Sequence, residues 1–291
     1  MNARETSKRI EPVTLQAENM KRDWIYLLVV ILLLSACAPR AATTPPATVP
    51  ATPPESRTLT VFAAASLTDA FTEIGQSFDA THPGMTTSFN FAGSQSLRTQ
   101  LEQGAIADVF ASANTKEMDT LVTDHLIPAD SAQIFLTNIL LVILPADNPA
   151  GIQTLEDLSR PAIKLVLAAE EVPVGKYARQ VLDNLNALYG TGFEAGVLAN
   201  VVSYEDNVKQ VVAKVQLGEA DAGIVYGSDA VAAPELKSIA IPQEYNVIAQ
   251  YPIAMLSSAP EPGLAAAFVD YVLSAEGQAI LQRWGFTPIN P

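Results

Sequence analysis

Short apolar runs alternate with amphipathic stretches along the chain from residue 58 onward. The run at 59–64 has the length and composition of a buried strand, and Leu67, Phe71, Ile74 and Phe78 then recur at the spacing of one helix face. The same alternation predicts further strands at 86–91, 108–111, 139–144, 164–168, 201–203, 222–225 and 248–255. Further helices are expected at 93–101, 114–122, 155–158, 176–188, 207–217, 262–273 and 275–284.

This order of elements predicts an α/β fold. Strands that alternate with helices form mostly parallel sheets with helices on both faces. Two consecutive helices at the C-terminal end break the alternation. The pattern alone fits either one doubly wound sheet or two α/β lobes, with the terminal helices returning to the first lobe.

The first 57 residues do not share this pattern. A run of thirteen mostly apolar residues, 24–36, follows Lys21 and Arg22, and it is too short for a comfortable membrane span. It ends in Leu-Ser-Ala-Cys, which resembles the lipobox of bacterial lipoproteins and makes Cys37 the lipid-bearing residue. The other interpretation is a free cysteine in a signal anchor. Met20 is an alternative start that would give a conventional short signal.

We therefore expect a lipoprotein signal peptide at 1–36. The lipidated Cys37 and a linker rich in proline, threonine and alanine then occupy 37–57. Six of the twenty prolines lie within 38–56, where no apolar periodicity is present, so this stretch is expected to be a polyproline-like spacer. A signal, a lipid and a spacer predict a protein held outside the cytoplasm on the cell membrane.

Composition and charge exclude several classes of function. The 291 residues carry a formal net charge of −14, so no basic excess is present to bind nucleic acid. One cysteine cannot form an internal disulfide. One cysteine and two histidines also disfavour a zinc site of the usual nitrogen and sulfur ligands.

Candidate chemistry lies where predicted strands end and helices begin. Four such junctions, at 64–66, 92–94, 172–175 and 204–208, carry small or hydroxyl residues. Helix N-termini offer free N–H donors and the positive end of the helix dipole, so several that converge can bind an anion. Ser66, with Asp69 three residues later, also has the pattern of an N-cap and capping box. For each serine alone, helix capping is the simpler interpretation.

Motifs of catalysis are mostly missing. The chain has no nucleophile elbow, no Walker loop, no dinucleotide-binding glycine motif and no zinc-protease motif. His82 and His125 are expected on the surface. The pairs at 170–171 and 205–206 are expected to be solvated loop carboxylates. Tyr226, directly after a predicted strand, stands where a phenol O–H could reach a ligand.

Motifs spread over about 230 residues resemble the periplasmic molybdate-binding proteins of ABC importers. The similar stretches are Val61-Phe-Ala-Ala-Ala-Ser-Leu-Thr-Asp-Ala-Phe, Phe91-Ala-Gly-Ser-Gln-Ser-Leu, Ala107-Asp-Val-Phe-Ala-Ser-Ala, Val172-Pro-Val-Gly-Lys-Tyr-Ala, Gly218-Glu-Ala-Asp-Ala-Gly-Ile-Val-Tyr-Gly-Ser-Asp-Ala, Tyr251-Pro-Ile-Ala and Ser274-Ala-Glu-Gly-Gln-Ala-Ile-Leu. The resemblance implies a two-lobed periplasmic-binding-protein fold of type II with the ligand in the hinge cleft. It assigns 58–140 plus 250–291 to lobe 1 and 141–249 to lobe 2.

The resemblance also implies a set of ligand-binding residues. Ser66 and Ser94 would bind the oxyanion through hydroxyl and backbone N–H groups, Val174 and Val208 through backbone N–H groups, and Tyr226 through its O–H. Molybdenum would be bound only as its oxyanion, with no direct protein ligand. Two departures from the family pattern stand out, because many members have serine in place of Gln95 and alanine in place of Val174. A variant of the site that uses the carboxylates of Glu205 or Asp206 stays open.

The function implied is capture of molybdate, and of tungstate, for the permease of an ABC importer. The protein would be a monomer and not an enzyme, would need no cofactor, and would have no nucleic-acid partner. Three alternatives stay open. They are a binding protein for another oxyanion such as sulfate, a ligand sensor, and a serine hydrolase that uses Ser66 or Ser94.

Overall fold

The computed structural model describes residues 57–289, and the predicted signal peptide, Cys37 and almost all of the predicted linker lie outside the described residues. The elements of the N-terminal half are β1 (Arg57–Ala64), η1 (Ala65–Leu67), α2 (Thr68–Thr81), β2 (Met85–Ala92), α3 (Ser94–Glu102), β3 (Val109–Ala111), α4 (Thr115–Thr123), β4 (Gln133–Asn138), β5 (Leu140–Leu144), η2 (Glu156–Ser159) and β6 (Leu165–Ala168). Those that follow are α5 (Pro173–Tyr189), α6 (Phe193–Ala199), β7 (Val201–Glu205), α7 (Val208–Gln216), β8 (Ala222–Tyr226), α8 (Gly227–Ala232), β9 (Lys237–Ala240), β10 (Ala249–Met255), α9 (Pro262–Leu273), α10 (Ala275–Arg283) and β11 (Thr287–Pro288).

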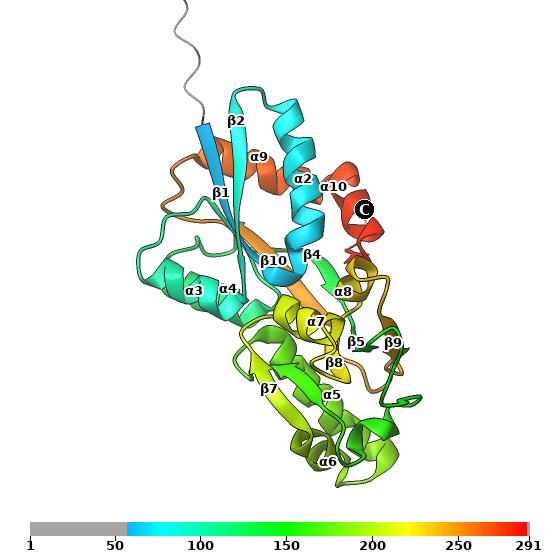
Figure 1. Cartoon of the computed structure of the whole chain (residues 1–291). Coiled ribbons are helices and arrows are strands. Elements are labelled where there is room, and N and C mark those ends of the chain that lie inside the picture. The colour runs from blue at the N-terminus through cyan, green and yellow to red at the C-terminus, as the bar shows by residue number, and fades with distance from the viewer. Residues whose placement is uncertain (1–56, 290–291) are drawn as a thin grey trace, which may run out of the picture. The chain divides into compact units, whose positions relative to one another are not determined.

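These elements form two sheets, each with its own helices, which confirms the two-lobed α/β prediction (Figure 1). The first sheet has the strand order β11-β4-β10-β3-β1-β2, and the second has the order β7-β6-β8-β5-β9. In Figure 1 the orange strand β10, which comes late in the chain, lies with the blue and cyan strands of the first sheet. The first sheet therefore combines the beginning and the end of the described chain.

Both sheets are mixed, so the prediction of mostly parallel sheets was wrong. Strand β1 pairs in parallel with β2 and β3, and β6 pairs in parallel with β7 and β8. Strands β5 and β10 instead pair antiparallel with their neighbours. Parallel neighbours need a long crossover, usually a helix. Strands β5 and β10 enter their sheets directly from a connection between the lobes, with no such helix before them.

Alternation along β1 explains how the first sheet is covered on both faces. Leu59, Val61 and Ala63 belong to the main core, whereas Phe62 points to a second, smaller core. Successive side chains of a strand point to opposite faces. Contacts place α2 and α9 against one part of the sheet and α3 and α4 against another. The second core is built from Phe62, Leu97, Leu101, Phe110, Met118 and their neighbours.

The chain passes from the first sheet to the second at Ile139, which alone separates β4 from β5, and returns between β9 and β10. The side chain of Asn246, on the return passage, donates to the backbone O of Leu140 at 2.8 Å and accepts from its backbone N at 3.1 Å. One amide group thus joins the two passages of the hinge.

The pattern of apolar residues missed several short elements. Strand β4 was not predicted, and neither were α6, α8, β9 and β11, which have only two to seven residues each. Elements this short offer too few residues to establish a period. Within residues 57–289, no single helix is long and apolar enough to cross a membrane, and α9 and α10 meet that criterion only as a pair bent by 62°.

Candidate functional site

A small cavity lies between the two lobes, at the carboxyl ends of strands from both sheets. Its lining residues are Ala64, Ala65, Ser66, Ala92, Gly93, Ser94, Ala113, Val172, Pro173, Val174, Asn207, Val208 and Tyr226. All four junctions singled out in the sequence contribute to it. The space that the centre of a water molecule can reach is about 10 Å³, roughly one water-sized sphere. Only a small ligand would fit between the two walls.

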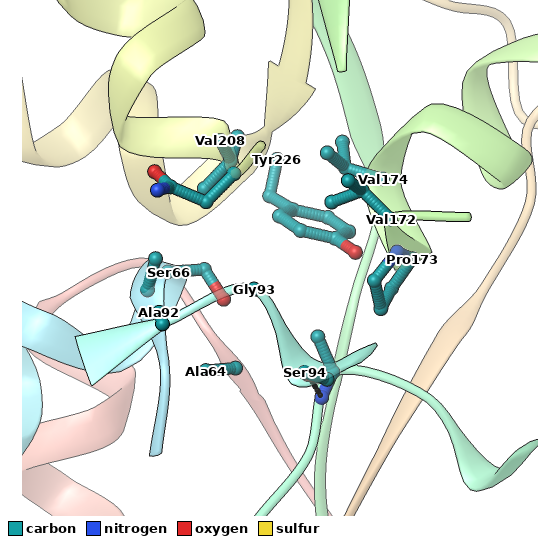
Figure 2. Close-up of a pocket in the computed structure, with 13 residues that line it drawn as sticks. Ala64, Ser66, Ala92, Gly93, Ser94, Val172, Pro173, Val174, Val208 and Tyr226 are labelled. Atoms are coloured by element: carbon teal, nitrogen blue, oxygen red, sulfur yellow. Dashed lines mark hydrogen bonds between the residues drawn. The ribbon is translucent and has the colours of Figure 1, made fainter. Parts of the chain in front are cut away.

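The wall from the first lobe presents two buried serines (Figure 2). Ser66 is 5% exposed and Ser94 is 1% exposed. The Ser94 Oγ accepts a hydrogen bond from the backbone N–H of Ala113 at 3.0 Å. A hydroxyl has one hydrogen and two lone pairs, so the Ser94 hydroxyl keeps its own hydrogen for a ligand.

Ser66 is not a helix cap, which corrects the capping-box interpretation. It lies inside η1, and α2 begins only at Thr68 with no side-chain cap. Its Oγ is 2.9 Å from the Oη of Tyr251. Asp69, the other half of the expected box, instead pairs with Lys209. The short 3₁₀ turn moves the helix start by one residue, so Ser66 faces the cavity and not the first turn.

The wall from the second lobe presents the beginnings of α5 and α7. Pro173 is the first residue of α5, where its missing N–H is of no consequence, so Val174 supplies the first free donor of that helix. Gly175 lets α5 start this close to the sheet, because a Cβ there would lie 1.9 Å from the backbone O of Ala169. On α7, Asn207 caps the helix by accepting from Gln210 N at 3.2 Å, which leaves the N–H of Val208 free.

Tyr226 closes the cavity from the end of β8. Figure 2 shows its ring extending between Val208 and Val174, with the hydroxyl toward Pro173. The residue is 1% exposed, and its Oη lies near the Tyr251 hydroxyl but makes no well-aligned hydrogen bond within residues 57–289. Burial raises the pKa of Tyr226 well above 10, so the phenol stays protonated. A buried O–H without an acceptor is costly, and a bound anion would supply that acceptor.

Every side chain that lines the cavity is uncharged. Its available polar groups are N–H and O–H donors at helix N-termini and on hydroxyls, an arrangement that suits an anion. None of the thirteen lining residues can act as a general base for Ser66 or Ser94. Across residues 57–289, no cluster of three or more His, Cys, Asp or Glu side chains could hold a metal ion.

Two polar contacts join the lobes beside the cavity. The Gln95 Nε2 donates to the backbone O of Asp206 at 3.1 Å. The Lys209 Nζ lies 2.7 Å from an Asp69 carboxylate oxygen across the cleft and 3.4 Å from the fully buried Asp229 carboxylate in its own lobe. Burial raises the pKa of Asp229 to about 6, although the nearby Lys209 opposes this shift. These contacts describe lobes that have closed on each other.

The five predicted ligand-binding residues, Ser66, Ser94, Val174, Val208 and Tyr226, all line this one cavity. The other candidates do not. His82 ends α2 with its Nδ1 2.9 Å from Phe78 O, and His125 is exposed.

The carboxylate candidates also lie outside the cavity. Glu170 and Glu171 are exposed, as predicted. Glu205 is buried, which corrects the expectation of a solvated carboxylate, because it is the last residue of β7 and pairs with Ser203 and Lys214. Neither Glu205 nor Asp206 lines the cavity, so the structure gives no support to a carboxylate ligand there.

Sequence reasoning missed Tyr251, Lys209 and Ala113 as residues that support the site. Tyr251 lies in the Tyr-Pro-Ile-Ala stretch, which was noted only as part of the resemblance. Its contact with Ser66 spans 185 positions of sequence, and that of Lys209 with Asp69 spans 140. No local pattern could have found these contacts.

Comparison with known proteins places this architecture in a family. The model of the bacterial extracellular solute-binding protein family matches residues 59–287. The molybdate-binding protein ModA of Mycobacterium tuberculosis is 41% identical over 243 residues, which cover 83% of this chain and 89% of ModA.

Two solved structures show the same fold. The periplasmic molybdate-binding protein of Azotobacter vinelandii has a TM-score of 0.69 and 20% identity, covering 80% of this chain and 99% of its own. The sulfate-binding protein SubI of Mycobacterium tuberculosis has a TM-score of 0.71 and 17% identity, covering 81% and 88%. At these identities the two structures support the fold alone. The family match and the ModA relative show that this chain belongs to the bacterial extracellular solute-binding proteins, in the group of the molybdate-binding proteins.

Proposed function

We propose that this protein captures molybdate, and tungstate with little discrimination, and delivers it to the permease of an ABC importer. The observation that carries the proposal is the closed, uncharged cavity whose polar groups are donors from both lobes. The ligand contacts we assign are the hydroxyl and N–H groups of Ser66 and Ser94, the N–H groups of Val174 and Val208, and the O–H of Tyr226. The identity to ModA supports the same ligand.

The protonation state of the ligand favours molybdate over phosphate. Molybdate at neutral pH is a fully deprotonated dianion, so each oxygen accepts hydrogen bonds and none donates. Hydrogen phosphate keeps a proton that would meet a donor in this cavity, and an unpaired polar group costs about 1–3 kcal/mol. Sulfate has the same proton inventory as molybdate but is smaller, so its rejection depends on cavity size. Tungstate matches molybdate in size and shape.

Closure of the lobes supplies the mechanism of delivery. Ser66 and Ser94 lie on one lobe, and Val174, Val208 and Tyr226 lie on the other. One small ligand can contact both sets only when the lobes meet. The ligand thus stabilises the closed state by its differential affinity for that state, and the permease would bind the closed protein. The lobe boundaries we propose are 58–140 plus 250–291 and 141–249, each within one residue of the points where the sheets change, at Leu140 and Ala249.

The family is one of extracellular proteins, so the chain acts outside the cytoplasm. We further propose that Cys37 carries the lipid that anchors it to the membrane, and that the protein is monomeric. Catalysis is not part of the proposal, because the cavity has two serines but no base beside them.

Isothermal calorimetry on the purified full chain, with detergent present because of the proposed anchor, tests the ligand. Molybdate, tungstate, sulfate, phosphate and chloride are titrated at equal ionic strength after bound ligand is removed. Binding of molybdate and tungstate alone is the expected result. Sulfate alone would keep the cavity and overturn the ligand, and no binding of any oxyanion would overturn the function.

A serine variant tests the residue assignment. Ser66→Ala combined with Ser94→Ala should weaken molybdate binding by at least about a hundredfold, since two hydrogen bonds to a charged ligand are lost. Ser238→Ala is the matched control, because Ser238 is exposed on β9 and does not line the cavity. Unchanged affinity in the double variant would contradict the assignment.

A further inference from the structure

Tyr251 lies directly behind the wall of the cavity without lining it. The residue is on β10 and has no exposed surface. Its ring packs edge-on against Tyr226 at 5.7 Å, Phe286 at 5.8 Å and Phe135 at 6.5 Å between ring centres. Three aromatic neighbours hold the ring, so the position of its hydroxyl is fixed. That hydroxyl is 2.9 Å from the Oγ of Ser66.

The direction of this hydrogen bond follows from where each hydrogen can go. Ser66 Oγ, at 2.9 Å, is the well-aligned hydrogen-bond partner of the Tyr251 Oη in the described chain, and the side chains of Asn138 and Tyr226 also approach this hydroxyl. Burial raises the pKa of Tyr251, so the phenol keeps its hydrogen. A buried hydroxyl is satisfied only if it donates that hydrogen to an acceptor. The Ser66 hydroxyl borders the cavity and has a second direction open to it. Tyr251 therefore donates, and Ser66 accepts.

The hydrogen bond from Tyr251 favours the Ser66 hydroxyl as a donor to the ligand. A free serine hydroxyl can rotate to accept or donate as its ligand requires. With Tyr251 donating to one lone pair of its oxygen, the Ser66 hydrogen cannot point at Tyr251 and is left available to the cavity. Ser94 is arranged in the same way by the backbone N–H of Ala113 at 3.0 Å. Both serines thus present hydrogen to the ligand.

We propose that Tyr251 is a positioning residue that holds the Ser66 hydroxyl as a donor and so makes the cavity selective for fully deprotonated oxyanions. The proposal deepens, and rests on, the proposed function of oxyanion capture. It concerns the preference among oxyanions more than the strength of binding. Without Tyr251, the Ser66 hydroxyl could turn and accept a hydrogen bond from a protonated ligand.

A double-mutant cycle tests whether Tyr251 acts through Ser66. Affinities are measured at pH 7.5 by calorimetry, directly for molybdate and as a weak competitor of molybdate for concentrated inorganic phosphate. Four full-length proteins are compared: the unaltered chain, Tyr251→Phe, Ser66→Ala and both changes together. We expect Tyr251→Phe to weaken molybdate binding by about tenfold, because the Ser66 hydroxyl is then no longer held as a donor to the charged ligand. The same change made in Ser66→Ala should have no further effect. Tyr271→Phe removes a hydroxyl outside the cavity and should alter neither affinity.

The ligand preference separates positioning from a general structural role. Tyr251→Phe should lower the ratio of molybdate to phosphate affinity by about tenfold. An equal loss for both ligands, an equal loss in both serine backgrounds, or no loss at all would overturn the proposal. If the unaltered chain binds no oxyanion, the proposed function itself fails, which is a distinct outcome.

Should Tyr251→Phe fail to fold, the unaltered protein carries the test. Tyrosine labelling and NMR report whether the Tyr251 hydroxyl hydrogen exchanges slowly and shows a nuclear Overhauser effect to the β-hydrogens of Ser66. A slowly exchanging hydrogen at that position is expected. A rapidly exchanging hydroxyl hydrogen would overturn the assignment of Tyr251 as donor.

Discussion

Replacing Tyr226 with phenylalanine should move ligand affinity and protein stability in opposite directions. The Tyr226 hydroxyl is fully buried and makes no well-aligned hydrogen bond in the described chain. A bound oxyanion would accept from it, and a hydrogen bond to a charged group is worth about 1.5–3 kcal/mol. Its loss should weaken molybdate binding by about 10- to 150-fold.

The ligand-free protein should respond in the other direction. An unsatisfied buried polar group costs about 1–3 kcal/mol, and the phenylalanine variant removes that group while it keeps the ring. The free energy of unfolding of the Tyr226→Phe variant should therefore equal that of the unaltered protein or exceed it by up to this amount. A water molecule in the small cavity would reduce the gain.

Calorimetry for affinity and urea unfolding for stability measure the two quantities on the same samples. Tyr271 provides a matched control, because its Oη is also buried and makes no well-aligned hydrogen bond in the described chain, but it belongs to α9, outside the cavity. Tyr271→Phe should leave the affinity unchanged. Two results would refute the assignment of Tyr226 as a buried donor that is satisfied only by the ligand. One is molybdate binding by Tyr226→Phe as tight as in the unaltered protein, and the other is a loss of more than about 1 kcal/mol in the free energy of unfolding without ligand.

Three further changes test other parts of the site. Gly175→Ala should lower the free energy of unfolding by about 1–3 kcal/mol or more and should weaken molybdate binding, because the added Cβ would lie 1.9 Å from a backbone oxygen. Gly192→Ala is the control, because a Cβ there meets open space, and it should change neither quantity. Urea unfolding and calorimetry measure the two effects. Gln95→Ala should weaken molybdate binding by about two- to tenfold, chiefly through faster dissociation, because the hydrogen bond to Asp206 between the lobes is lost. An unchanged dissociation rate of molybdate in stopped-flow measurements would contradict this. Burial raises the pKa of Asp229 to about 6 from 3.8, so the folded protein favours the protonated carboxyl group. This preference contributes on the order of 3 kcal/mol to the free energy of unfolding below pH 4, and the contribution is lost as the pH rises through 6. Urea unfolding from pH 4 to 7 should show this decline, and Asp229→Asn should flatten it.

Local sequence patterns predicted which segments line the cavity, because the cavity is built from local features. A strand followed by a small residue and a helix start is visible in the sequence at 64–66, 92–94, 172–175 and 204–208, and the structure brings all four to one cavity. Tyr226 was found for the same reason, since it ends a recognisable strand. The assignment of a ligand role to each donor depended on the family resemblance and stays a prediction.

The features that sequence patterns missed depend on contacts distant in sequence. Ser66 had the local pattern of a cap, yet the 3₁₀ turn and the hydroxyl of Tyr251 give it a different partner. Asp69 had the pattern of a capping carboxylate, yet it pairs with Lys209 on the other lobe. In both cases a tertiary contact replaced the local one, and periodicity contains no information about such partners. The antiparallel strands were missed because they depend on where the chain crosses between lobes.

The charge of the protein makes the use of neutral donors significant. The chain carries a formal charge of −14, and the ion cluster that joins the lobes has two carboxylates, Asp69 and Asp229, for one ammonium, Lys209. Neither the protein as a whole nor this cluster attracts an anion, although screening over about 8 Å limits the repulsion. Binding must therefore come from donors in direct contact with the ligand. A lysine or arginine in the cavity would attract chloride, sulfate and phosphate alike, because a point charge does not sense protons on the ligand. Donors with a fixed direction, such as the hydroxyls that Tyr251 and Ala113 orient, distinguish an oxygen that only accepts from one that carries a hydrogen.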